Sequence, residues 1–186
     1  MRVLAISGSL RRDSYNTKLL RAAEELLPGA VELEYWNDTK AIPAYDEEDD
    51  LEPAPRAVAA FREAIAQADA VLFATPEYNS SIPGSLKNAL DWVSRPHKTN
   101  PFRNKPVAVV GASTGAFGAV WAQAALRKVL GAIGARVVEA DVAVGHAHAK
   151  FDGDGELVDE TVREQLHEVV DALLAEIPAR LLAAAV

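Results

Sequence analysis

The chain has 186 residues, a net charge of −8 and no cysteine. Its length predicts a single domain over residues 1–186, and the missing cysteines exclude disulfides, thiolate metal sites and cysteine nucleophiles. The acidic balance disfavours a nucleic-acid partner, and no run reaches the roughly 20 apolar residues of a membrane span. We therefore expect a cytoplasmic protein that binds neither nucleic acid nor membrane.

Strand-like runs alternate with amphipathic helical patterns along the whole chain. The runs are short and either apolar throughout or apolar at every second residue, as in β-strands. They cover residues 3–6, 31–35, 70–74, 107–110 and 138–144. Apolar residues at helical spacing follow each run, over residues 19–27, 58–68, 86–93, 122–133 and 162–177. Five β-α units predict an α/β fold, a doubly wound parallel sheet with helices on both faces.

The composition of the runs predicts the strand order. The first, third and fourth are apolar throughout, which indicates strands covered on both faces. The second and fifth carry acidic residues at alternate positions, such as Glu32 and Glu139, and belong at the edges. The flavodoxin-like order 2-1-3-4-5 places those two strands at the edges, and a six-stranded Rossmann order fits less well.

The loop after the first run has the chemistry of a phosphate site. Ser9, Arg11, Ser14 and Asn16 supply side-chain donors, and a helix that starts near Ser14 or Tyr15 adds free backbone N–H groups. Arg11 can hold two phosphate oxygens at once. The simpler alternative is that Ser14 or Asp13 only caps the helix, which leaves Arg11 unexplained. The loop is neither a Walker A motif nor a Gly-x-Gly-x-x-Gly motif.

The loop after the third run suits a flat ring. Pro76 stiffens this loop, and the backbone N–H groups of Glu77, Tyr78 and Asn79 can then face the polar edge of an isoalloxazine. Tyr78 can stack near such a ring. The alternative is an ordinary strand-to-helix turn capped by Ser80 or Ser81. The first two loops together predict a site for flavin mononucleotide (FMN).

A third loop of small residues, with Ser113 and Gly115, follows the fourth run and allows close approach of backbone to a ligand. Other candidate residues give weaker evidence of a function. The pair His146 and His148 is interpreted as exposed loop residues, because a catalytic zinc site needs three protein ligands, and we expect no metal. Trp92 and Trp121 lie on predicted helices and indicate packing or a subunit contact. No basic cluster in the sequence marks a site for the 2′-phosphate of NADPH.

With these residues in view, the chain resembles the NADPH-dependent FMN reductase family, and within it the bacterial quinone and chromate reductases. The matching segments are residues 8–16 and 76–92, and the likeness spans nearly the whole chain. The resemblance implies that Ser9, Arg11, Ser14 and Asn16 hold the FMN phosphate. By the same resemblance, the segment from Pro76 to Asn79 lines the ring and Ser113 lies near the other side of the ring. It also implies a homodimer or homotetramer, with residues 86–93 contributing to the contact.

The activity so implied is FMN-dependent reduction of quinones, azo compounds, free flavin or similar small acceptors by NADPH or NADH. Hydride passes through the flavin N5, so no side chain is required as nucleophile or general acid, and the kinetics are expected to be ping-pong. Tyr78 is expected to shape the stacking site. One alternative is a flavodoxin-type electron carrier without its own NAD(P)H activity, although such carriers have no counterpart of Arg11. Another is a module that has lost its flavin.

Overall fold

The computed structural model describes residues 1–177, so residues 178–186 of the predicted domain lie outside the described part. A parallel sheet with the order β2-β1-β3-β4-β5 forms its centre, and β6 also pairs with β4. The strands are β1 (Arg2–Ser7), β2 (Glu32–Trp36), β3 (Ala70–Ala74), β4 (Pro106–Ala112), β5 (Arg136–Val137) and β6 (Ala143–Val144). The predicted strand order is confirmed.

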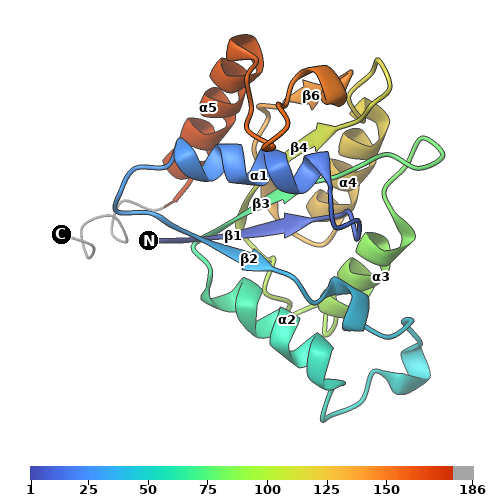
Figure 1. Cartoon of the computed structure of the whole chain (residues 1–186). Helices are drawn as coiled ribbons and strands as arrows, with labels where there is room; N and C mark the ends of the chain where they lie inside the picture. The colour runs from blue at the N-terminus through green and yellow to red at the C-terminus, as the bar shows by residue number, and fades with distance from the viewer. Residues whose placement is uncertain (178–186) are drawn as a thin grey trace.

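Helices cover both faces of this sheet, as predicted (Figure 1). The helices are α1 (Tyr15–Glu25), α2 (Arg56–Gln67), α3 (Gly84–Val93), α4 (Val120–Ala132) and α5 (Glu160–Ala175). Apolar residues of α1 and α5 form one core with one side of the sheet, and those of α2, α3 and α4 form the second core with the other side. None of the helices described is long and apolar enough to cross a membrane.

The burial of the strands explains their positions. Every residue of β3 and β4 is buried, because helices cover both faces of these central strands. In β2, at the edge, Glu32 and Glu34 are exposed while Leu33 is buried. The alternation of acidic and apolar residues therefore predicted the edge position of β2 correctly.

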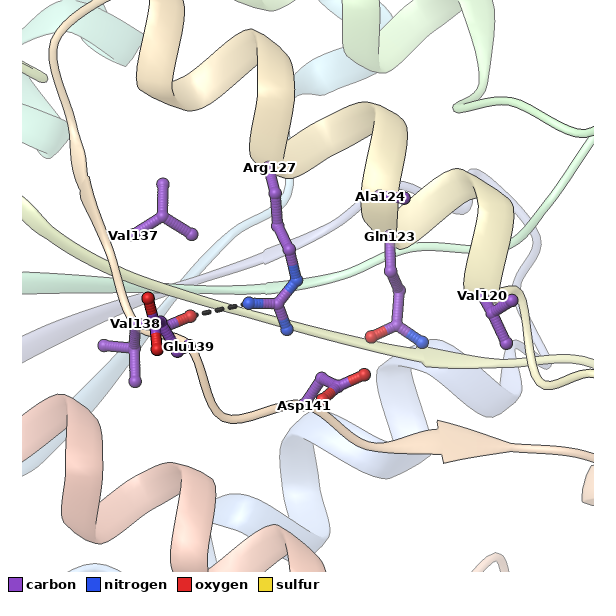
Figure 2. Close-up of a pocket in the computed structure, with 8 residues that line it drawn as sticks. All are labelled: Val120, Gln123, Ala124, Arg127, Val137, Val138, Glu139 and Asp141. Carbon is purple, nitrogen blue, oxygen red and sulfur yellow. Dashed lines mark hydrogen bonds between the residues drawn. The ribbon is translucent and has the colours of Figure 1, made fainter.

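The fifth strand differs from its prediction. One strand over residues 138–144 was expected, but two short strands pair with β4: β5 just before this segment and β6 at its end. Between them the chain leaves the ladder, and the guanidinium of Arg127 from α4 occupies the gap (Figure 2). It donates hydrogen bonds of 2.6, 2.9 and 3.0 Å to the carbonyls of Val138, Ala140 and Val109.

A second side chain of α4 supports the same segment. Gln123 is buried, and its amide nitrogen donates to the carbonyls of Gly118 and Val142, each at 3.1 Å. Side chains of α4 thus complete the edge of the sheet between the two backbone hydrogen bonds that join Val138 to Val107 and Gly111 to Val142. Backbone polar groups need such partners when they are removed from water, and here the partners come from the helix that precedes the segment.

Candidate functional site

The three loops predicted to bind a ligand meet at the carboxyl edge of the sheet. They enclose a cavity of about 140 Å³ between the ends of β1, β3 and β4. Nine of the residues predicted from the sequence line it: Ser9, Arg11, Ser14, Tyr15, Asn16, Pro76, Glu77, Tyr78 and Ser113. Ala112 and Thr114 complete the lining, whereas Asn79 and Gly115 lie in the same loops but outside it.

The first loop presents unpaired donors to this cavity. Ser14 is the N-cap of α1, and its hydroxyl oxygen accepts from the backbone N–H groups of Asn16 and Thr17. Within the described chain, the backbone N–H groups of residues 12–15 donate to no protein acceptor. The positive end of the helix dipole adds to these donors. Capping and anion binding are therefore compatible at Ser14, since the cap leaves the preceding N–H groups free.

Arg11 is exposed and forms no ion pair with a described residue. Its backbone N–H donates to the hydroxyl of Ser9 at 3.3 Å, which fixes the loop while the guanidinium remains available. By contrast, the nearby Lys18 is paired with Asp13 at 2.6 Å. Arg11 is thus the cation of the cavity lining that is available to an external anion.

Asn16 has a structural role that the sequence did not reveal. Its side chain is buried, donates to the carbonyl of Ala112 and accepts from the N–H of Ala112, each bond being 2.9 Å long. These two bonds tie the first turn of α1 to the end of β4. Asn16 therefore positions two walls of the cavity relative to each other, and one N–H of its amide remains for a ligand.

The second loop forms a tight turn. Tyr78 and Ser81 exchange backbone hydrogen bonds of 3.0 and 3.1 Å, and Asn79 and Ser80 between them have positive φ angles of 53° and 58°. The N–H of Tyr78 is therefore used within the turn, contrary to the expectation that it faces a ring, whereas those of Glu77 and Asn79 have no described acceptor. The ring of Tyr78 is 51% exposed beside the cavity.

Glu77 joins this loop to the next helix. Its carboxylate accepts hydrogen bonds of 3.1 Å from the backbone N–H groups of Trp121 and Ala122, in the first turn of α4. The residue before α4, Ala119, has no side-chain cap to offer, so Glu77 supplies the cap from 44 residues away. A negative charge at a helix N-terminus is favourable. The same hydrogen bonds fix the position of the second loop, which forms part of the cavity wall.

Backbone contacts hold the third loop. The N–H of Ser113 donates to Val144 and its carbonyl accepts from Ala147, while its hydroxyl accepts from the N–H of Gly115 at 3.1 Å. His146 and His148 are both exposed here, and no group of three metal-ligating side chains occurs among the residues that the structure describes.

The two tryptophans have different surroundings. Trp92 is fully buried, and its indole nitrogen donates to the carbonyl of Pro43 at 2.9 Å, so it packs within the chain. Trp121 is 47% exposed and meets the ring of Phe117, itself 64% exposed, at a centroid distance of 5.0 Å. These rings form an apolar surface at the start of α4, the helix end that Glu77 caps.

Several other hollows are larger than the cavity. The one in Figure 2, about 460 Å³, lies between α4 and the segment that joins β5 to β6, and no predicted site residue lines it. A second, of about 340 Å³, shares Ser9 and Arg11 with the cavity and adds Arg12, Arg21 and Lys40. The sequence did not mark this basic groove, because its cations come from separate segments.

Comparisons with known proteins agree on one family. A family model described as NADPH-dependent FMN reductase matches residues 1–149. An NAD(P)H-dependent FMN reductase of Pseudomonas aeruginosa is 44% identical over 93% of this chain and 93% of its own. A quinone reductase of Pseudomonas putida is 42% identical over 91% of this chain and 90% of its own.

A solved structure shows the same fold. The flavoenzyme FerB of Paracoccus denitrificans, an NAD(P)H:(acceptor) oxidoreductase, superposes with a TM-score of 0.85 and 36% identity, over 95% of this chain and 96% of that one. A flavodoxin of Pseudomonas aeruginosa superposes with a TM-score of 0.59 and 17% identity, which supports the flavodoxin-like architecture alone.

Proposed function

Because the chain belongs to the NADPH-dependent FMN reductase family, we propose that it reduces quinones or similar small acceptors with NAD(P)H through FMN bound in the three-loop cavity. It is an oxidoreductase of that family, with FMN as cofactor and NAD(P)H as reductant. The observation that carries the assignment to this cavity is the convergence of nine predicted residues on it. When bound, FMN supplies the hydride chemistry.

The donors of the first loop fit the FMN phosphate. The backbone N–H groups of residues 12–15 have no described acceptor, and Arg11 has no described ion-pair partner. A phosphate dianion satisfies both sets of donors at once, with Ser9 and Ser14 beside them. Asn16 fixes the position of Ala112, which also lines this site, through two hydrogen bonds.

The turn from Pro76 to Ser81 fits the ring of the flavin. Within residues 1–177 no acceptor is found for the backbone N–H groups of Glu77, which lines the cavity, and Asn79, which lies just outside it, so both suit the polar edge of the ring. Tyr78 has an exposed ring at the cavity mouth. We infer that Tyr78 shapes the space in which a nicotinamide or an acceptor stacks. Tyr78→Ala is then expected to change the relative kcat/KM of two quinones more than the affinity for FMN, and an equal loss of both would contradict this role.

One shared stacking space implies a defined kinetic order. Reductant and acceptor cannot occupy the stacking space beside Tyr78 at the same time, so oxidised nicotinamide leaves before the acceptor binds. This predicts ping-pong kinetics: double-reciprocal plots of rate against acceptor concentration, each at a different fixed NAD(P)H concentration, should be parallel. Intersecting lines would require two separate spaces. The quinone reductases among the relatives support quinones as acceptors, with azo compounds and free flavin as the wider class.

The apolar surface near the cavity supports a homodimer or homotetramer. Phe117 and Trp121 are exposed, and Tyr78 is half exposed on the adjoining loop. A second copy that covers these rings would remove apolar area from water next to the flavin. The mass of the protein in solution, measured with Trp121→Ala as the comparison, tests this assembly. The composition also supports our inference of a cytoplasmic location.

The enzyme is separated from an electron carrier by one experiment. Purified protein loaded with FMN is mixed under nitrogen with NADPH or NADH, and its visible spectrum is followed. An NAD(P)H-dependent enzyme bleaches the yellow chromophore within its turnover time and regains the colour when benzoquinone is added. A carrier keeps its colour with both nucleotides, and that result would reject the proposed function.

A further inference from the structure

A basic groove lies beside the cavity, on the other side of the first loop. Four cations line it: Arg11 and Arg12 from the loop, Arg21 from α1, and Lys40 from the short helical turn Thr39–Ala41 that follows β2. The groove has a volume of about 340 Å³. Four positive charges in one groove stand out on a chain whose net charge is −8.

These cations are not neutralised by carboxylates of residues 1–177. In the described part of the chain none of the four forms an ion pair with a carboxylate. Two acidic side chains near the groove already have partners, since Asp13 pairs with Lys18 and Glu24 accepts a 2.8 Å hydrogen bond from the hydroxyl of Tyr35. Clustered cations without partners repel one another, and a bound anion relieves that repulsion.

The lining also has groups that suit a nucleoside. Tyr35 and Trp36 bring two aromatic rings to the lining. Thr39 is only 5% exposed, and its hydroxyl has no protein partner within residues 1–177. A ligand that combines phosphate, sugar hydroxyls and a flat base would use all three kinds of group.

Ser9 and Arg11 line both the groove and the cavity, so the two spaces adjoin across the first loop. We propose that the groove binds the adenosine 2′-phosphate half of NADPH and thereby selects NADPH over NADH. Arg12 and Lys40 hold the 2′-phosphate, and Arg11 lies between this phosphate and that of FMN. The proposal rests on the proposed function, because it takes the nicotinamide to react in the adjoining cavity.

Nucleotide binding to the FMN-loaded protein tests the groove without turnover. Calorimetric titrations with adenosine 2′,5′-bisphosphate, adenosine 5′-monophosphate and inorganic phosphate are compared for wild type and for Arg12→Gln/Lys40→Gln. Lys128→Gln is the matched control, an exposed cation of α4 outside the groove. Wild type and control are expected to bind the bisphosphate at least about tenfold more tightly than the monophosphate, and the double variant to lose that preference.

Steady-state kinetics give a second readout. The double variant should raise KM for NADPH about tenfold more than it raises KM for NADH, because only the 2′-phosphate loses its partners. Equal binding of the two nucleotides by wild type, or a preference that survives in the double variant, would overturn the proposal. So would inorganic phosphate that binds as tightly as the bisphosphate, since the groove would then hold a simple oxyanion.

The same samples separate this proposal from the one on which it rests. Bound FMN is quantified by its absorbance, and its bleaching by NADPH is recorded before each titration. Protein that fails to hold FMN or to be bleached contradicts the proposed function. Protein that passes both tests but shows no preference for the 2′-phosphate contradicts the groove assignment alone.

Discussion

The side-chain amide of Asn16 pairs with both backbone groups of Ala112, donating to its carbonyl and accepting from its N–H at 2.9 Å each. The two residues are 96 positions apart in the sequence, and the pair is buried. It imitates one rung of a sheet ladder between the start of α1 and the end of β4. Two of the loops around the proposed flavin site depend on this contact.

Replacement of Asn16 by Ala leaves the N–H and the carbonyl of Ala112 buried without partners. We expect the free energy of unfolding to fall by about 2 to 4 kcal/mol, measured by urea denaturation of FMN-free protein. Asn16→Asp should also destabilise, because a carboxylate cannot donate to the carbonyl. Gln165→Ala, at an exposed position of α5, is the control and should change stability by less than about 0.5 kcal/mol. A similar small change for Asn16→Ala would contradict the role given to this pair.

Loss of the Glu77 carboxylate should weaken both the start of α4 and the loop beside the cavity. Glu77→Ala removes the acceptor for the N–H groups of Trp121 and Ala122, at an expected cost of about 1 to 2 kcal/mol. Glu77→Gln keeps an acceptor but loses the charge, so its effect should be smaller. Amide hydrogen exchange should accelerate at Trp121 and Ala122 in Glu77→Ala, with exposed Glu164→Ala as the control. Unchanged exchange there would show that the cap does not hold the helix.

The split fifth strand depends on Arg127. Arg127→Met removes the donors for three backbone carbonyls, and we expect a loss of about 2 to 4 kcal/mol in unfolding free energy. Burial also lowers the pKa of this guanidinium, although it remains charged at neutral pH. FMN affinity should stay within about twofold of wild type, because Arg127 does not line the cavity. A large loss of FMN affinity with unchanged stability would contradict this division of roles.

Acid should weaken the start of α5. Asp159 is its N-cap, and hydrogen bonds from Lys150 and from the backbone N–H of Val162 hold its pKa below the ordinary value. The pKa is lower in the folded state, so the stabilisation is present above about pH 4, where the unfolded carboxyl is ionised, and disappears as the pH falls through the folded value. The stability difference between wild type and Asp159→Asn should therefore shrink as unfolding is measured from pH 6 down to pH 2.5. A difference that does not change over this range would contradict the assignment.

Much of the fold was predictable because its signals are local. Fully apolar strands such as 70–74 indicated central positions, and the alternation around Glu32 and Glu34 indicated an edge. The same rule predicted one continuous fifth strand. That prediction was wrong in detail because Arg127, from α4, binds the carbonyls of Val138 and Ala140 within the segment, and no local pattern reveals such a contact.

In the site too, local features were predictable and contacts between separate segments were not. Residues that share a loop after a strand, such as Ser9 and Arg11, were found because parallel strands place their following loops at one edge. The partners of Asn16 and Glu77 lie 96 and 44 residues away and could not be predicted from the sequence. The basic groove was missed for a related reason, since Arg12, Arg21 and Lys40 meet only after the chain has folded.

The central claim is that Arg11 and its loop recognise the phosphate of FMN. Equilibrium titrations that follow flavin fluorescence, with FMN and with riboflavin, test it most directly in wild type and Arg11→Ala. Because only FMN carries the phosphate, the account predicts that Arg11→Ala binds FMN about 10- to 100-fold more weakly and binds riboflavin as wild type does. Unchanged FMN affinity, or an equal loss for both flavins, would contradict it.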